Sequence, residues 1–233
     1  MLDQAFEALK KFDFGTPLSD LQAIEDAAVA AHTDAEVRKD LEQRLIAALG
    51  TGISRDAKDY VCRKLALIGS GTAVPVLASL LSSQANAHLT RHALERIPGP
   101  EAGAALATAA ADLSGNLKIG AIGSLGVRGE VNAVATLASL LKDKDAAVVR
   151  AAALSLGAIG GNESAAALFS TALEATSADT SSVIDGLLTC AESLIKQKKA
   201  KEATAIYASL SGDDQPRLVR LAATRGMLVC AEA

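Results

Sequence analysis

Aromatic residues are scarce in this chain, which has no tryptophan, two tyrosines and four phenylalanines among 233 residues. Proteins that bind single-stranded nucleic acid stack the bases on aromatic side chains, so few such surfaces can form here. The formal net charge of -4 provides no general positive field toward nucleic acid or an anionic membrane. No run of about 18 apolar residues occurs, so no segment is expected to span a bilayer. We therefore expect neither a nucleic-acid partner nor membrane insertion.

Cysteine is also rare and odd in number, with Cys62, Cys190 and Cys230. All three stand in apolar helical patterns, so we expect small buried side chains in the reduced state and no disulfide framework. The N-terminal stretch MLDQAFEALKKFDFG contains acidic residues and no apolar core, which is not the pattern of a signal peptide. As written, the chain is expected to be cytoplasmic. It would be periplasmic or exported if a signal peptide has been removed.

Hydrophobic residues are plentiful, at 50% of the chain, and most of them are alanine and leucine. These residues favour helices, whereas the β-branched and aromatic residues that favour strands contribute little. We therefore expect an all-α protein.

Four segments repeat one pattern at intervals of 29, 31 and 31 residues, counted between anchoring leucines. The anchors are Leu65, Leu94, Leu125 and Leu156. Four positions after each stands a helix-stopping residue: Gly69, Pro98, Gly129 or Gly160. Twelve positions after each stands a second leucine: Leu77, Leu106, Leu137 or Leu168. Each segment thus predicts a helix A, a tight turn and a helix B. One hairpin cannot cover both of its apolar faces, so the hairpins are expected to stack into a right-handed α-solenoid.

Three glycines in the third segment, Gly120, Gly123 and Gly126, are evenly spaced like those of a phosphate-binding loop. Such a loop needs a preceding strand and a following helix N-terminus, and neither is expected here. We expect the glycines to lie inside helix A, where each costs about 1 kcal/mol relative to alanine and permits close approach of a neighbouring helix.

The stretches DAAVVRAAALSLGAIG and TAVPVLASLLSS resemble HEAT repeats, in particular the short HEAT-like repeats of phycobilisome lyases. The resemblance covers Ser54 to about Glu174 and implies an armadillo-like solenoid, a fold that serves many partners. We expect a helical cap over residues 1–52 and four HEAT-like repeats over 53–175. A longer hairpin and a final unpaired helix are expected over 176–233, all in one continuous solenoid.

The regions before and after the four repeats also contain patterns that predict helices. Ser19 with Gln22, and Thr33 with Glu36, fit the capping box of a helix N-terminus. Near the C-terminus, AESLIKQKKAKEATAIYASL resembles one tetratricopeptide-type hairpin, with Lys198 where that family usually has glycine. The final PRLVRLAATRGMLVCAEA predicts a helix A without its helix B, so we expect the natural chain to continue or another domain to pack there.

A column of hydroxyl residues stands fourteen positions after the anchors: Ser79, Thr108, Ser139 and Ser170. On helix B this position points away from the buried leucine, and Val76 and Thr136 are among its flanking residues. In the family resemblance, helix B lines the concave face. The column therefore predicts either a shallow uncharged groove for a partner helix or peptide, or small residues that only permit tight curvature.

Two further groups of residues have structural interpretations. HEAT repeats often carry an aspartate and a basic residue that form a ladder of hydrogen bonds along the array. Asp112 with Lys118, and Lys58 in the basic column, match that pattern.

His88, His92 and Glu95 share one helix face, a spacing that can chelate a metal. The repeat register places Asp59 beside His88 and Arg63 beside His92, so we expect ion-paired surface histidines and no metal.

No Ser-His-Asp or Cys-His arrangement stands in a plausible register, and no cofactor is expected. Iron-dependent hydroxylases among HEAT-like proteins carry His-Glu dipeptides, whereas none of His32, His88 and His92 precedes a glutamate. Base-excising relatives use a cationic, aromatic-lined face, which this acidic chain lacks. We expect a non-enzymatic, monomeric module that binds a protein or peptide. The alternatives are a bilin lyase or lyase-associated subunit, and a spacer domain of a larger exported bacterial protein.

Overall fold

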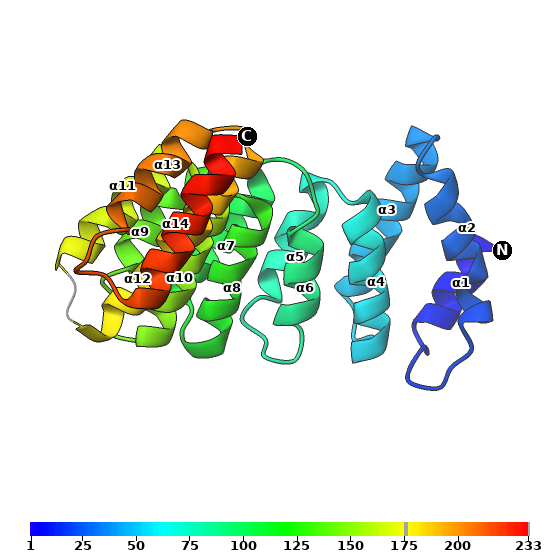
Figure 1. Ribbon diagram of the computed structural model, residues 1–233. Helices are drawn as coiled ribbons and strands as arrows, with labels where there is room; N and C mark the ends of the chain where they lie inside the picture. Colours follow the sequence, from blue (N-terminus) through cyan, green and yellow to red (C-terminus); the bar gives the residue numbers. More distant parts are fainter. Residues whose placement is uncertain (175–176, 233) are drawn as a thin grey trace. The chain divides into compact units, whose positions relative to one another are not determined.

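The computed structural model describes residues 1–174 and 177–232, and within them every regular element is a helix (Figure 1). This confirms the predicted all-α solenoid of stacked helical hairpins. The chain divides into two compact units, Met1–Ala109 (unit 1) and Ala110–Ala233 (unit 2). Of the predicted segment boundaries, the one at 175/176 lies outside the described residues, and the one at 52/53 stays a prediction.

Unit 1 is a succession of short helices. They are α1 (Leu2–Leu9), η1 (Leu18–Leu21), α2 (Gln22–Ala30), α3 (Ala35–Leu49), α4 (Arg55–Ile68), η2 (Gly71–Ala73), α5 (Val74–Ser79), α6 (Ala87–Leu94) and most of α7 (Pro100–Asp112). Contacts join α1 to α2, α2 to α3, α3 to α4 and α4 to α6. In this unit α4 and α6 are the A helices of the first two repeats, and α5 and α7 are their B helices.

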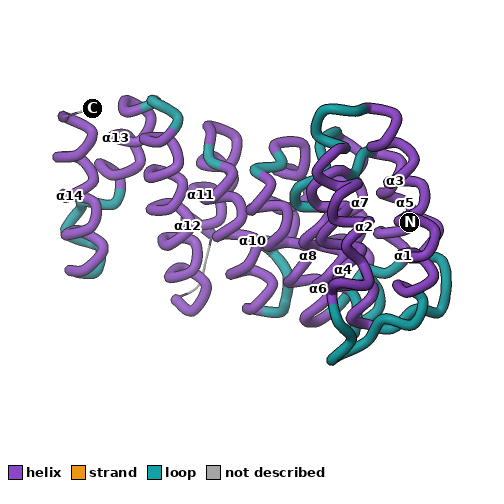
Figure 2. The backbone as a smooth tube through the Cα atoms, turned by 90° about the vertical axis from the view of Figure 1, so that its right-hand side faces the viewer, coloured by secondary structure: helices purple, strands orange, loops and turns teal. Residues whose placement is uncertain are grey.

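Unit 2 continues with longer helices. They are α8 (Gly115–Arg128), η3 (Val131–Ala133), α9 (Val134–Leu140), α10 (Ala146–Ile159), α11 (Gly161–Glu174), α12 (Ser177–Lys196), α13 (Ala200–Ser209) and α14 (Arg217–Glu232). The A helices α8 and α10 and the following helix α12 lie in one row, with α10 packed between the other two (Figure 2). The B helices α9 and α11 pack on α10. The last two helices, α13 and α14, pack on each other, and α13 also packs on α12.

The eight leucines that define the repeats are all fully buried. Each anchor and each second leucine has an exposed fraction of 0%: Leu65, Leu77, Leu94, Leu106, Leu125, Leu137, Leu156 and Leu168. The apolar faces assigned to helices A and B are therefore the faces that form the core. Burial of this size is the main stabilising contribution in a stacked array, because each hairpin covers its neighbour.

Three of the four predicted helix stops lie at the residue that ends helix A. Gly69, Gly129 and Gly160 directly follow α4, α8 and α10, and the last two have positive φ angles of 63° and 70°. The second repeat differs, because α6 ends at Leu94, four residues before Pro98. A proline ring clashes with the carbonyl four positions earlier, so the helix has to stop there rather than at the proline itself.

The two predicted capping boxes at the N-terminal end are wrong in detail. Ser19 lies inside η1, and Leu21, the residue before α2, makes no side-chain capping bond. For α3, the cap is Asp34, whose carboxylate accepts hydrogen bonds from the backbone N–H groups of Glu36 (2.9 Å) and Val37 (3.1 Å). The neighbouring aspartate wins because a charged acceptor near the positive end of the helix dipole binds these donors more strongly than a hydroxyl.

Glycines in unit 2 permit direct contact between helix backbones. The three glycines in question lie inside α8, as expected, and a Cβ atom added at Gly126 would stand 2.9 Å from the Cα of Ser155 in α10. A Cβ at Gly157 would stand 2.5 Å from the carbonyl oxygen of Gly186 in α12. Gly123, by contrast, has open space at this position. Close approach therefore explains Gly126 and does not explain Gly123.

The hairpin of α12 and α13 turns at Lys198, which has a φ angle of +61°. The Lys199 N–H donates to the Leu194 carbonyl (2.8 Å), which closes the end of α12. This is the position where the tetratricopeptide-type pattern has glycine, and a left-handed residue is indeed required there. The next helix, α14, leaves Leu218 and Leu221 79% and 56% exposed.

Candidate functional site

The predicted hydroxyl column lies on the surface of the B helices in both units. Ser79 and Thr108 are exposed on α5 and α7 of unit 1, and Ser139 and Ser170 are exposed on α9 and α11 of unit 2. The flanking positions are half-buried in all four repeats: Val76, Ala105, Thr136 and Ala167. We call these eight residues the B-helix face.

Two hydroxyls of the B-helix face are already engaged by their own helices. Ser79 Oγ donates to the Val76 carbonyl oxygen (2.8 Å), and Ser139 Oγ donates to that of Thr136 (2.7 Å). Each hydroxyl keeps its acceptor lone pairs toward solvent. The face is thus small, uncharged and able to accept hydrogen bonds at a repeated spacing.

In the predicted ladder, Lys118 pairs with a different aspartate from the expected Asp112. Lys118 Nζ lies 3.6 Å from Asp143 Oδ2, whereas Asp112 is exposed at the end of α7. Asp143 stands eighteen residues after Leu125, the same offset that separates Asp112 from Leu94. The basic residue therefore reaches the aspartate at the end of its own repeat, because the chain passes back beside the first turn of helix A after helix B.

Asp143 is held as a carboxylate by its surroundings. The Asp145 N–H donates to its Oδ1 (3.0 Å), and this bond, followed by the nearby Lys118 charge, lowers the pKa of Asp143 although burial opposes it. Asp145 in turn caps α10 by accepting from the Ala147 N–H (2.8 Å). Lys58, the other expected ladder residue, is half-buried in the first turn of α4.

The histidine face of α6 does not gather metal ligands. No group of three His, Cys, Asp or Glu side chains suited to a metal ion occurs in the part of the chain that the structure describes, and this part includes His88, His92 and Glu95. His92 Nδ1 lies 3.3 Å from Arg96 Nη1, one turn further along. Arg63, which the register placed beside His92, instead pairs with Asp59 of its own helix at 2.8 Å.

Two of the three cysteines are buried as expected. Burial raises the pKa of the Cys62 thiol to about 12 and that of Cys190 to about 11, so neither is a reactive thiolate at neutral pH. Cys230 is half-exposed on α14, which corrects the expectation that all three are buried. All three are free thiols. No helix of the described residues combines the length and the apolar character needed to cross a membrane.

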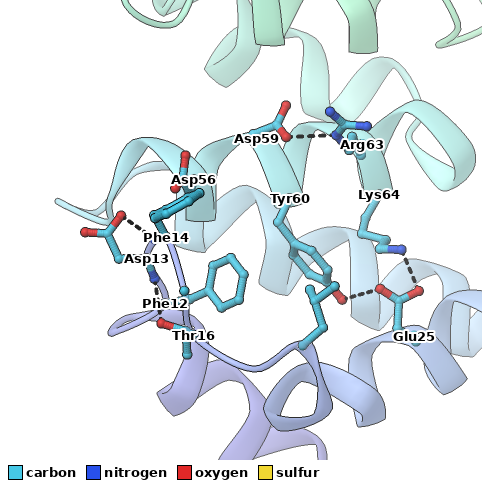
Figure 3. A pocket seen from close by; sticks show the side chains of 12 residues that line it. Phe12, Asp13, Phe14, Thr16, Glu25, Asp56, Asp59, Tyr60, Arg63 and Lys64 are labelled. Carbon is cyan, nitrogen blue, oxygen red and sulfur yellow. Dashed lines mark hydrogen bonds and ion pairs between the residues drawn. The ribbon is translucent and has the colours of Figure 1, made fainter.

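One feature that the sequence did not reveal is an aromatic pocket in unit 1 (Figure 3). Its volume is about 560 Å³, and it is lined by the loop that follows α1, by Glu25 of α2 and by α4 between Asp56 and Lys64. Phe12, Phe14 and Tyr60 all line it, so half of the six aromatic rings of the chain meet there. They are up to 48 residues apart in the sequence, and the packing of α4 beside the loop brings them together.

The inner wall of the pocket is a hydrogen-bonded group of three side chains. Tyr60 donates its hydroxyl proton to Glu25 Oε1 (2.7 Å), and Lys64 Nζ donates to Glu25 Oε2 (2.6 Å). Lys64 Nζ also lies 5.1 Å from the centre of the Tyr60 ring. Burial acts to raise the pKa of Glu25, but the two hydrogen bonds together with the lysine charge outweigh it and lower the pKa.

The likeness of this chain to known proteins concerns its repeats and its fold. Residues 103–188 match the HEAT-repeat family. No curated protein sequence matches the chain. Among solved structures, lipovitellin is similar with a TM-score of 0.65 and 13% sequence identity over 98% of this chain. This chain spans only 26% of the length of the lipovitellin chain, and at such identity the likeness shows the fold alone.

Two other solved structures align over nearly the whole chain with lower scores. Human deoxyhypusine hydroxylase is 15% identical over 100% of this chain and 96% of its own, with a TM-score of 0.37. A designed armadillo repeat protein in complex with the peptide (KR)4 is 17% identical over 98% of each chain, also with a TM-score of 0.37. These scores are too low to support a conclusion about function.

Proposed function

Because this chain is a HEAT-repeat protein, we propose that it is a non-enzymatic scaffold that binds a protein or peptide partner through its B-helix face. The observation that carries the proposal is the repetition of the face: the same exposed hydroxyl and half-buried small residue recur on α5, α7, α9 and α11. The need to form a core explains why the leucines recur in every repeat. Core formation does not require the exposed positions of the B helices to be alike.

The chemistry of the B-helix face indicates how a partner would bind. Small side chains leave the helices low in relief, so a helix or an extended peptide can lie across the two B helices of one unit. The hydroxyl lone pairs provide hydrogen-bond acceptors to donors of that partner. No aromatic or arginine side chain occurs in the face, so each repeat contributes little and affinity depends on contact with several repeats.

Charged substitutions within each unit test the proposal. Affinity capture from a lysate of the source organism compares the wild-type chain with Ser139→Glu/Ser170→Glu. The matched control is Val127→Glu/Leu154→Glu, which places two charges on exposed positions of the A helices α8 and α10 in the same unit. We expect the wild type and the control to capture a partner that the B-helix variant does not capture. The reason is that burying an unpaired carboxylate in an interface is costly.

A second pair of substitutions, Ser79→Glu/Thr108→Glu, tests unit 1 separately. Circular dichroism establishes that each variant is folded. A partner lost equally from the A-helix control, or retained by both B-helix variants, would contradict the proposal.

A further inference from the structure

The aromatic pocket of unit 1 is separate from the B-helix face, since its residues come from the loop after α1, from α2 and from α4. Its volume of about 560 Å³ lies within the range of sites that bind small molecules or single side chains. What it binds can be inferred from three properties: an exposed ring, a surplus of carboxylates, and a cation already held on its inner wall.

The exposed ring belongs to Phe14, which is 95% accessible. Its loop is nevertheless well ordered by hydrogen bonds: Asp13 N–H donates to Thr16 Oγ1 (3.1 Å) and Thr16 N–H donates to the Asp13 carbonyl (3.0 Å). Gly15 supplies the φ angle of +85° that the turn requires. A large apolar ring that is presented to water on an ordered turn is typical of a contact residue rather than of a core residue.

The loop is also fastened to the start of α4, through the backbone of Phe12. Ser54 Oγ donates to the Phe12 carbonyl oxygen (2.6 Å) and accepts from the Ala57 N–H (3.0 Å) at the start of α4. The Phe12 and Tyr60 ring centres are 6.0 Å apart. Figure 3 shows the Phe14 ring beside Asp56, with Asp13 at the outer edge of the pocket.

Acidic residues outnumber basic residues in the lining. Four carboxylates face two cations there: Asp13, Glu25, Asp56 and Asp59 against Arg63 and Lys64. Each cation is engaged, because Arg63 pairs with Asp59 (2.8 Å) and Lys64 with Glu25 (2.6 Å). The surplus charge therefore rests on Asp13 and Asp56, the two carboxylates next to Phe14.

Neither surplus carboxylate has a close cationic partner. Asp13 Oδ1 accepts from the Phe14 N–H (2.9 Å), within its own turn. Asp56 Oδ1 lies 3.9 Å from Arg55 Nη1, beyond hydrogen-bond distance, and Arg55 donates from its Nε to the Ala85 carbonyl (3.2 Å) instead. A ligand cation at this end of the pocket would find ring faces and carboxylates together.

On the inner wall, an aromatic ring and a carboxylate together already hold a cation. Lys64 is held by a carboxylate and lies over the Tyr60 ring, an arrangement in which ion pairing and the cation–π interaction reinforce each other. The outer half repeats the same two elements with Phe12, Phe14, Asp13 and Asp56, and the cation beside it, Arg55, stays 3.9 Å from Asp56.

We infer that the outer half of this pocket binds the guanidinium group of an arginine residue in a partner peptide. A guanidinium group is planar and weakly hydrated, so it stacks on phenylalanine rings and donates paired hydrogen bonds to carboxylates, which an ammonium group does less well. The arginine site is independent of the B-helix face, so either proposal can fail without the other.

Binding of short peptides tests the arginine site directly. The probe is acetyl-Gly-Gly-Arg-Gly-Gly-amide, titrated into the isotope-labelled full chain while backbone amide signals are followed by NMR. The reference peptide contains citrulline, which has nearly the shape of arginine without its charge. We expect the arginine peptide alone to shift the signals of Phe14, Gly15 and Tyr60, with a millimolar Kd that rises as salt screens the carboxylates.

Two variants and two controls separate this site from general attraction to an acidic protein. Phe14→Ser and Asp56→Asn should each weaken binding by about two- to fivefold, the range expected for one exposed cation–π contact or one charge pair. Val29→Ser and Glu36→Gln change an exposed apolar residue and an exposed acidic residue elsewhere in unit 1, and they should bind as the wild type does.

Three results would overturn the inference. They are equal binding of the citrulline peptide, unchanged binding by both pocket variants, and no shift of these signals at peptide concentrations of about 20 mM. N-propylguanidinium provides the last comparison, since it carries the same single charge and the same group without a peptide. If it binds more tightly than the arginine peptide, the site belongs to a free small cation and the inference of a partner arginine is wrong.

Discussion

Unit 1 and unit 2 are built from the same kind of hairpin, and polar side chains join helices in both, as Gln197 Nε2 does in unit 2 by donating to the Ile159 carbonyl (3.3 Å). Unit 2 adds direct contacts between helix backbones. In unit 1 polar side chains tie one helix to the next: Glu42 accepts from the Ser70 N–H (2.6 Å), and Arg38 Nε donates to the Ile68 carbonyl (2.8 Å). In unit 2 the backbones of α10 and α12 touch at Gly157 and Gly186.

The difference shows that one leucine core can support two kinds of joint, that is, two kinds of contact between neighbouring helices: polar side chains and glycine backbones. Long polar side chains bridge helices that stay apart and satisfy the backbone groups at helix ends, which would otherwise be unpaired. Glycine contacts remove the side chain altogether and gain dense packing of backbone against backbone. The leucines are common to both units, so they should dominate stability, and the glycine contacts should distinguish unit 2.

The largest effect is expected from the shared core. Leu77→Ala in unit 1 and Leu137→Ala in unit 2 should each lower the free energy of unfolding by about 2–5 kcal/mol, because both side chains are fully buried and truncation leaves a cavity. Denaturant titrations followed by circular dichroism measure both. A loss below about 0.5 kcal/mol at either position would mean that the assigned B-helix core is wrong.

The glycine joint of unit 2 should be the next most sensitive. Gly157→Ala should cost about 2–3 kcal/mol, since the new Cβ would lie 2.5 Å from the Gly186 carbonyl oxygen and the helices would have to separate. Gly123→Ala in α8 is the matched control: its Cβ meets open space, so better helix propensity should raise stability by up to about 1 kcal/mol. Equal effects of the two substitutions would refute the backbone contact.

The polar joint of unit 1 is tested at Glu42, which is only 7% exposed. Glu42→Ala should cost about 1–2 kcal/mol, because the Ser70 N–H and hydroxyl lose a charged acceptor. Glu36→Ala, at an exposed position of the same helix, should change the free energy of unfolding little. If both variants are equally stable, the joint contributes nothing measurable.

A stabilising substitution is expected in unit 2. Ser164 is fully buried, and its hydroxyl has no hydrogen-bond partner among the described residues. The equivalent positions of the other three repeats hold alanine: Ala73, Ala102 and Ala133. Ser164→Ala should therefore raise the unfolding free energy by about 1 kcal/mol, because it removes a buried, unsatisfied polar group. Destabilisation in thermal melts would show that the hydroxyl has a partner after all.

The smallest effect concerns pH and the inner wall of the aromatic pocket. Folding lowers the pKa of Glu25, so its ionised form stabilises unit 1 at neutral pH, and this contribution is lost as the pH falls through the lowered pKa. The difference in unfolding free energy between the wild type and Glu25→Gln should thus shrink from neutral pH to pH about 3. Glu36→Gln provides the control for general acid effects. A difference that does not depend on pH would contradict this assignment.

The repeat pattern predicted most of the fold, because a buried face imposes regular spacing on the sequence. Leu125 and Leu156 mark that face, and Gly129 and Gly160 mark the turns that follow. Caps were predicted less well: Asp34 and Thr33 are adjacent, and the capping-box spacing favoured Thr33, whereas the charged Asp34 accepts from the free N–H groups.

The hydroxyl column was predicted to be exposed, and it is, but its role as a binding surface remains a proposal. Exposure follows from helical periodicity, whereas a partner leaves no trace in a single sequence. The aromatic pocket could not be foreseen, because Phe12 and Phe14 belong to a loop, and loops show no periodicity that would place them beside Tyr60.

The sequence by itself determined that this protein is an α-solenoid and which leucines form its core, since periodic apolar residues have one efficient way to be buried. Only the tertiary structure decided which helices touch through glycine, that Lys118 reaches Asp143, and that the loop after α1 meets α4 to form a pocket. These contacts depend on distances between segments remote in the chain, and such distances are set by packing rather than by local propensity.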